Sequence, residues 1–256
     1  MIHRQTVPVL GAPIDVLGWD DVLARIAVWA NQRESRVVCF CNAHSVVTYG
    51  RDPEFAVALL HADLAAPDGA PVAWMLRLLG HRGQPRLGGP DVMLALLAQA
   101  EVNEHGVFLL GSTKETLSAL RKRLRGHYPK LQIVGALAPP HRPLTAEEDA
   151  RVVQHIQRSG AQIVFVGLGC PKQERWMHEH RGRIPAVMLG VGAAFDFHAG
   201  ALKRAPRWMR RMGLEWLHRF AQEPRRLAWR YVDTNAVFLW RALGQLLSRP
   251  LRRRSS

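Results

Sequence analysis

The chain has 256 residues, of which 48% are hydrophobic, and its formal net charge is +14. A chain of this length can bury one large core or two modest ones. It has no uncharged apolar run long enough for a transmembrane helix, and residues 1–21 lack the apolar stretch of a signal peptide. These features exclude an integral helical membrane protein, and we expect a globular protein in the cytoplasm.

Apolar runs alternate with helical patterns along the first 200 residues. We predict strands at 37–42, 64–67, 106–111, 131–137, 162–169 and 186–192. We predict helices at 43–62, 70–80, 89–104, 113–128, 144–160 and 171–182, and Thr145 and Glu148 have the spacing of a capping box. Such alternation indicates an α/β fold with a mainly parallel sheet that helices cover on both faces.

Parallel sheets bind ligands beyond the carboxyl ends of their strands. Five candidate residues fall at such ends: Asn42, Asp68, Gly111, Gly169 and Gly192. Asp68 stands between Pro67 and Gly69, so it is either a turn residue or a general base.

Two glycine-rich segments, 167–174 and 190–200, follow apolar runs. Small residues let backbone N–H groups approach an anion, and a helix N-terminus would add positive charge. Neither segment has the G-x-G-x-x-G pattern of dinucleotide-binding turns, and the chain has no P-loop motif. Since many tight strand-to-helix turns bind nothing, these glycines alone do not establish an anion site.

The cysteines Cys39, Cys41 and Cys170 form a sparse set. Cys39 and Cys41 would point to the same side of a strand. None of the twelve histidines lies at a recognisable zinc spacing. We therefore interpret all three as buried thiols and expect no metal site.

Most of the positive charge lies at the C-terminal end. Residues 201–256 contain fourteen arginines and lysines but three acids, a net charge of +11, which leaves +3 for residues 1–200. This segment has helical spacing, a break at Pro224 and four of the eight tryptophans. Such a segment either lies on an anionic bilayer surface or packs on the sheet as a terminal helical layer, and one helix can do both. We divide the chain into an α/β domain of residues 1–200 and a basic, Trp/Arg-rich helical appendage of residues 201–256.

Six segments occur in an order typical of one family: "PDGAPVAW", "RLGGPD", "FLLGS", "VFVGLGCPKQERW", "GVGAAFDFHAGALKRAP" and "GLEWLHRFAQEPRR". Together they resemble the WecG/TagA/CpsF glycosyltransferases (glycosyltransferase family 26) over about residues 8–240. The resemblance implies a Rossmann-like α/β fold of the GT-E type with a basic C-terminal appendage. It also implies a bacterial enzyme of exopolysaccharide or cell-envelope polysaccharide synthesis.

Enzymes of this family transfer a sugar from a UDP donor to a saccharide on a polyprenyl diphosphate. The transfer inverts the anomeric centre and needs no metal ion or cofactor. The donor sugars are glucose, N-acetylmannosamine and its uronic acid. The resemblance further implies homo-oligomers and peripheral attachment to the anionic inner face of the cell membrane.

The resemblance assigns catalytic roles to Asp68, as the base that deprotonates the acceptor hydroxyl, and to Asn42 beside the donor. Relatives often carry Thr where this chain has Phe40, which slightly favours an exopolysaccharide enzyme over a teichoic-acid one. Arginines suit the leaving diphosphate because they stay charged and bind phosphate in pairs of hydrogen bonds. The substrate-binding candidates are Arg86, Asp91, Gly111, Gly169, Lys172, Gln173, Gly192, Asp196, Arg204, Arg207, Arg219, Arg225 and Arg226.

Several of these residues have simpler interpretations. Arg86 could be a solvated surface charge, Lys172 and Glu174 an exposed pair, and Asp196 a cap for its own loop. For the whole chain, a nucleic-acid-binding protein would use the basic Trp-containing tail, but no recognition motif accompanies that charge. An NAD-dependent enzyme would need an intact dinucleotide fingerprint. We therefore expect no nucleic-acid partner.

Overall fold

The computed structural model describes residues 4–248, apart from the side chains of residues 207, 211 and 225–232. Its centre is a six-stranded parallel sheet with the strand order β4-β3-β8-β7-β5-β6. The strands are β3 (Arg36–Cys41), β4 (Leu64–Pro67), β5 (Val107–Gly111), β6 (Ile133–Leu137), β7 (Ile163–Gly167) and β8 (Val187–Gly190). The predicted parallel α/β sheet is confirmed.

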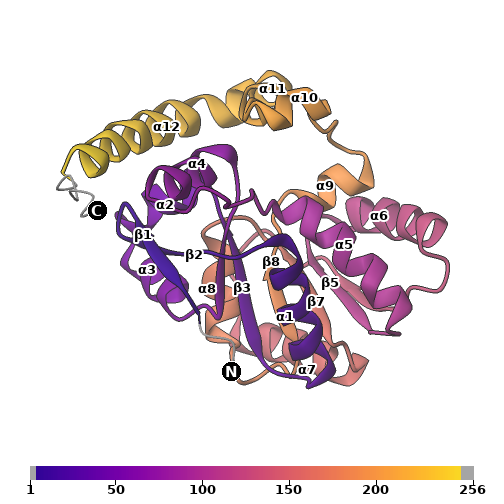
Figure 1. The fold of residues 1–256 in the computed structure, drawn as a ribbon. Helices are drawn as coiled ribbons and strands as arrows, with labels where there is room; N and C mark the ends of the chain where they lie inside the picture. Colours follow the sequence, from indigo (N-terminus) through magenta and orange to yellow (C-terminus); the bar gives the residue numbers. More distant parts are fainter. Residues whose placement is uncertain (1–3, 249–256) are drawn as a thin grey trace.

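Helices cover both faces of this sheet (Figure 1). One face packs on α2 (Ala43–Tyr49), α3 (Pro53–Leu60), α4 (Ala70–Leu78), α7 (Ala146–Ser159) and α8 (Lys172–Glu179). The other packs on α1 (Trp19–Asn31), α5 (Gly89–Val102), α6 (Lys114–His127) and α9 (Ala194–Ala199). Alternation along β3 sends Cys39 and Cys41 to the first face and Phe40 to the second, as the two-residue period of a strand requires.

The three cysteines are free thiols. Cys39 and Cys41 are buried as predicted, and burial raises their pKa well above the ordinary value. Cys170 is only partly buried and lies beside the Ser45 hydroxyl.

The predicted helix at 43–62 was wrong in one respect, because the chain forms two helices there, α2 and α3. Asp52 caps α3 by accepting a hydrogen bond from the Phe55 N–H at 3.1 Å, and Pro53 is the first helical residue. Proline has no N–H to donate to the preceding turn, so an Asp-Pro pair ends one helix and starts the next. The capping box of Thr145 and Glu148 is present as predicted.

The N-terminal hairpin of β1 (Thr6–Val9) and β2 (Ala12–Asp15) lies outside the main sheet. The carboxylate of Asp15 is buried, pairs with Arg4 at 2.9 Å and accepts a hydrogen bond from the Ala65 N–H at 2.6 Å. This polar contact fixes the hairpin beside β4.

The C-terminal segment forms α10 (Arg207–Arg211), α11 (Glu215–Gln222) and α12 (Pro224–Leu247), with the predicted break at Pro224. Together they form an arm along one side of the molecule, beside α2 and α4 (Figure 1). Phe238 and Ala242 of α12 are buried in the core of the first face. The Gln245 amide bonds to both the Leu10 N–H and the Pro8 carbonyl of the hairpin, at 2.9 and 2.7 Å. The arm is therefore fixed to the α/β part along one face.

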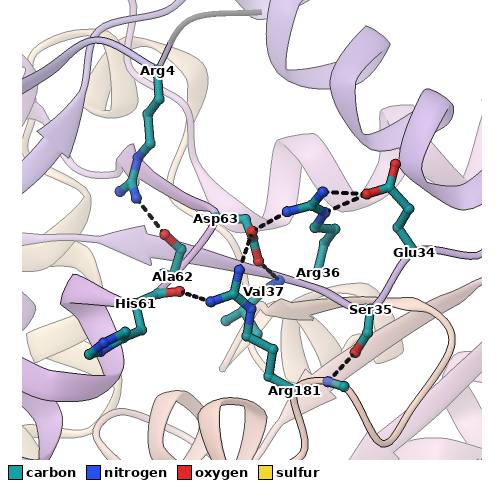
Figure 2. Close-up of polar contacts among 10 residues, drawn as sticks. Arg4, Glu34, Ser35, Arg36, Val37, His61, Ala62, Asp63 and Arg181 are labelled. Carbon is teal, nitrogen blue, oxygen red and sulfur yellow. Dashed lines mark hydrogen bonds and ion pairs between the residues drawn. The ribbon is translucent and has the colours of Figure 1, made fainter. Parts of the chain in front are cut away.

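Asp63, which lies just before β4, stabilises the sheet at the end where its strands begin (Figure 2). Its carboxylate accepts hydrogen bonds from Arg36 and Arg181, both at 2.7 Å, and from the Val37 N–H at 2.9 Å. Only 6% of this side chain is exposed. Asp63 thus joins β3, β4 and the segment after α8 at the edge opposite to the strands' carboxyl ends.

We expect Asp63→Ala to lower the free energy of unfolding by about 2–3 kcal/mol, because it leaves a backbone donor and two arginines without this acceptor. Glu34→Ala is the matched control, since the Glu34 carboxylate pairs only with Arg36 among the residues that the structure describes and is more exposed. It should cost less than about 1 kcal/mol. Urea unfolding measures both, and equal losses would contradict the role given to Asp63.

Candidate active site

A cavity of about 770 Å³ lies at the carboxyl ends of the strands and is bounded on one side by the C-terminal arm. This volume suits a ligand of nucleotide size. Strand ends and the turns after them supply part of its lining, and α11 and α12 supply another part. The lining includes Asn42, Asp68, Ser112, Gly169, Gln173, Gly192, Asp196, Glu215, Arg219 and Asn235. Asp68 and both glycine-rich turns therefore face one common space.

Asp68 lies in the tight turn between β4 and α4. Its N–H donates to the Cys41 carbonyl at 2.9 Å, which extends the pairing of β4 with β3 by one residue. Its Oδ1 accepts a hydrogen bond from the Gly69 N–H at 2.6 Å. The backbone thus holds the carboxylate at the wall of the cavity, with 19% of the side chain exposed.

Asp68 belongs to a cluster of alternating charges. The Arg86 guanidinium lies 3.5 Å from Asp68 Oδ1 and 2.6 Å from Glu215 Oε2. Arg204 pairs with Asp91 at 2.6 Å and approaches Glu215 at 3.7 Å. Because Arg210 also lies 3.4 Å from Asp91, the described cluster contains three acids and three arginines and is electrically balanced.

Gly88 occupies the centre of this cluster. A Cβ atom there would lie 2.9 Å from Arg86 Nη2 and 3.3 Å from both Asp68 Oδ1 and Asp91 Oδ2. The missing side chain therefore allows the three charged groups to approach one another, and it gives the "RLGGPD" segment a structural reason for its glycine.

Two carboxylates of the cluster are perturbed in opposite directions. Burial raises the pKa of Asp68, with smaller contributions from Glu215 and Asp91, while Arg86 and the Gly69 N–H oppose the rise. Burial also favours a higher pKa for Asp91, but the hydrogen bond and charge of Arg204 lower the pKa overall. A raised pKa makes the Asp68 carboxylate the stronger proton acceptor of the two.

Gln173 ties together the two glycine-rich turns. Its Oε1 accepts hydrogen bonds from the Gly169 and Gly192 N–H groups at 3.2 and 3.1 Å. Its Nε2 donates to the Gly190 carbonyl at 3.0 Å and to Glu174 Oε1 at 2.9 Å. These bonds engage the amide within the protein, so its observed role is to hold the floor of the cavity. The Gly169 and Gly192 N–H groups, which the sequence suggested as donors to a bound anion, are therefore already hydrogen-bonded to Gln173.

Glu174 is a buried carboxyl group in the same floor. Burial raises its pKa to about 7, and hydrogen bonds from Gln173 and the Cys170 thiol offset only part of this rise. The sequence interpretation of Lys172 and Glu174 as an exposed pair is therefore wrong for Glu174. Lys172 itself is exposed on α8 and is not a lining residue of the cavity.

The other predicted residues are distributed around this cavity. Asn42 caps α2 by accepting a hydrogen bond from the Ser45 N–H at 3.1 Å, and the Ser112 hydroxyl donates to Asp196 at 3.3 Å. Gly111 is buried at the end of β5, next to the lining residue Ser112. The buried Phe40 ring supplies apolar lining.

The arginines proposed for the diphosphate have different surroundings. Arg86 is mostly buried, which overturns its interpretation as a solvated surface charge. Arg219 lines the cavity, lies 3.8 Å from Glu223 and stacks over the Phe197 ring at 5.9 Å. Arg204 is engaged with Asp91. The side chains of Arg207, Arg225 and Arg226 lie outside the described residues.

Sequence reasoning missed Glu215 and Arg210 as members of the site, and it left Glu174 out of the substrate-binding candidates although this residue shares a helical turn with Gln173. Glu215 carried one usable signal, because it is one of three acids in a segment with fourteen basic residues. Over the described part of the chain, no group of three or more His, Cys, Asp or Glu side chains is arranged to hold a metal ion.

Comparison with known proteins gives the same family as the six segments. The family model described as "Glycosyl transferase WecG/TagA/CpsF family" matches residues 7–252. The chain is 31% identical, over 79% of its length and 76% of the relative, to the N-acetylglucosaminyldiphosphoundecaprenol N-acetyl-beta-D-mannosaminyltransferase of Bacillus subtilis (strain 168). It is 29% identical to the Staphylococcus aureus (strain NCTC 8325 / PS 47) protein of that name, over 94% of its length and 90% of the relative.

We expect the contribution of Glu174 to stability to fall as pH rises from about 4.5 to 7, because the folded state keeps the proton of Glu174 over that range while the unfolded chain releases it. Glu174→Gln should remove this contribution, which amounts to roughly 3 kcal/mol above pH 7. Urea unfolding of the wild type and the variant across this pH range measures the difference between their free energies of unfolding. The contributions of the other titrating groups cancel in this difference. Parallel curves would contradict the assignment.

Proposed function

Since the chain belongs to the WecG/TagA/CpsF family of glycosyl transferases, we propose that it transfers a sugar from a UDP donor to a saccharide linked to a polyprenyl diphosphate. In this proposal, the transfer inverts the anomeric carbon. The observation that carries this proposal is the Asp68 carboxylate. It lies in the wall of a nucleotide-sized cavity, its pKa is raised, and Arg86 and Arg219 also line that space.

The proposed reaction is a single displacement. Asp68 accepts the proton of the acceptor hydroxyl while that oxygen attacks the anomeric carbon of the donor. The bond from this carbon to the UDP oxygen breaks, and the diphosphate leaves with additional negative charge. Arg219, which lines the cavity and does not belong to the balanced Asp68 cluster, supplies positive charge to stabilise it.

The names of the relatives support a narrower choice of substrates. Each of the two relatives described above is named for transfer of N-acetylmannosamine to N-acetylglucosaminyl-diphosphoundecaprenol. We therefore propose UDP-N-acetylmannosamine as the first donor to assay and lipid-linked N-acetylglucosamine as the first acceptor. UDP-glucose with lipid-linked glucose is the comparison pair, since Phe40 favours an exopolysaccharide product.

Asp68→Asn should lower kcat by about 10²–10⁴-fold, because the amide cannot accept the hydroxyl proton. The assay follows sugar transfer from the UDP donors to the lipid-linked acceptors. A rise in Tm on addition of UDP serves as the control, since the variant should keep the donor site. Turnover close to that of the wild type in a folded variant would end the proposed role of Asp68.

We also propose that residues 201–256 attach the protein to the anionic inner face of the membrane. Within residues 4–248, none of the helices combines the length and apolar character needed to cross a bilayer. The arm nevertheless exposes large apolar side chains, among them Trp208 at 58% and Trp240 at 79%. Exposed tryptophans in a strongly basic segment are suited to the interface of an anionic bilayer.

We expect the double variant Trp208→Ala/Trp240→Ala to bind anionic vesicles at least about tenfold more weakly, because two exposed apolar anchors are lost. Vesicle sedimentation at two salt concentrations measures this. Val102→Ala is the matched control, since Val102 is 80% exposed at the end of α5, away from the arm. Tighter binding to single-stranded DNA than to vesicles would contradict the membrane proposal.

A further inference from the structure

Glu215 is the first residue of α11 and lies against the charge cluster from the C-terminal arm. Its carboxylate is 2.6 Å from Arg86 Nη2, whereas the distance from Arg86 Nε to Asp68 Oδ1 is 3.5 Å. Arg86 therefore makes its close ion pair with Glu215 and a looser one with Asp68. Within the described chain, its buried Nε makes no hydrogen bond.

We propose that Glu215 is a positioning residue that holds Arg86 back from Asp68, so that the Asp68 carboxylate stays available as a base. This inference rests on the proposed function, because it gives Asp68 the task of removing the acceptor proton. The hydrogen bond that the Asp68 carboxylate makes comes from the Gly69 backbone and not from the guanidinium.

The electrostatics act in the same direction. The charged groups that face Asp68 are Arg86, Glu215 and Asp91, and burial and the two carboxylates raise its pKa while Arg86 lowers it. Around Asp91 lie Arg204, Arg210 and the His198 ring of α9. Removing Glu215 deletes one like charge and leaves Asp68 as the nearest acid for Arg86, and both changes make Asp68 a weaker base.

Close contact between the C-terminal arm and α4 positions Glu215. Gly213 has a φ of +73°, and a Cβ atom there would lie 2.6 Å from Ala70 Cβ and 2.8 Å from the Trp74 ring. The turn before α11 can therefore seat directly on the helix that begins after the Asp68 turn. A residue of the arm thus reaches Arg86, which lies between α4 and α5 in the chain.

The test is the pH dependence of sugar transfer by Glu215→Ala and Glu215→Gln. We expect Glu215→Ala to lower kcat about tenfold or more and to move the acid limb of the kcat/KM profile to lower pH, with the KM for the UDP donor within about twofold of the wild type. Glu215→Gln loses the like charge but keeps an oxygen that can accept from Arg86, so it should show a smaller shift in the same direction and a smaller loss of kcat.

Asp233→Asn is the matched control, since it changes an acid of the same arm that pairs with Arg51 away from this cluster. It should keep both the rate and the profile of the wild type. An acid limb that stays in place in folded Glu215→Gln overturns the proposal, even if Glu215→Ala loses activity, because that loss would then reflect support of the fold. Full activity of Asp68→Asn would instead refute the proposed base itself, independently of Glu215.

Discussion

One buried amide joins the two turns on which the cavity rests. Gln173 spans the ends of β7 and β8, and three of its four hydrogen bonds hold Gly169, Gly190 and Gly192 against α8, while the fourth goes to Glu174. Buried backbone groups must find partners inside the protein, and here a single side chain serves three of them. The position of the floor relative to the Asp68 turn follows from this arrangement, since β3 joins β8 to β4 in the sheet.

Above that floor, the chemistry depends on balanced charges that come from distant parts of the sequence. Asp68 follows β4, Arg86 precedes α5, and Glu215 begins α11. Buried charges are tolerated when each has a partner of opposite sign, and removal of one partner leaves the other uncompensated. The cluster therefore makes the C-terminal arm part of the proposed catalytic machinery as well as its proposed attachment to the membrane.

The sequence predicted the sheet well because strands buried on both faces are continuous apolar runs between turn residues. It missed the N-terminal hairpin, whose two strands have four residues each and contain Pro8 and Pro13. The prediction joined α2 to α3 because the apolar spacing continues across Asp52 and Pro53.

For the site, the positions of Asp68 and the glycine-rich turns at strand ends were enough to predict that they lie close together. The pairing of Arg86 with Glu215, in contrast, leaves no local pattern in the sequence. For Gln173, the motif indicated a ligand contact, but its bonding partners lie after β7 and at the end of β8, and only folding brings them together.

The bonds of Gln245 to Pro8 and Leu10 join the last described helix to the first hairpin. The residues joined by these two bonds are 235 and 237 positions apart in the sequence. All strands of the sheet precede the arm in the sequence, and the side of the cavity that holds Glu215 cannot close until the arm has docked. Docking of the arm therefore completes the site, and the same segment carries the surface proposed to bring the protein to the lipid.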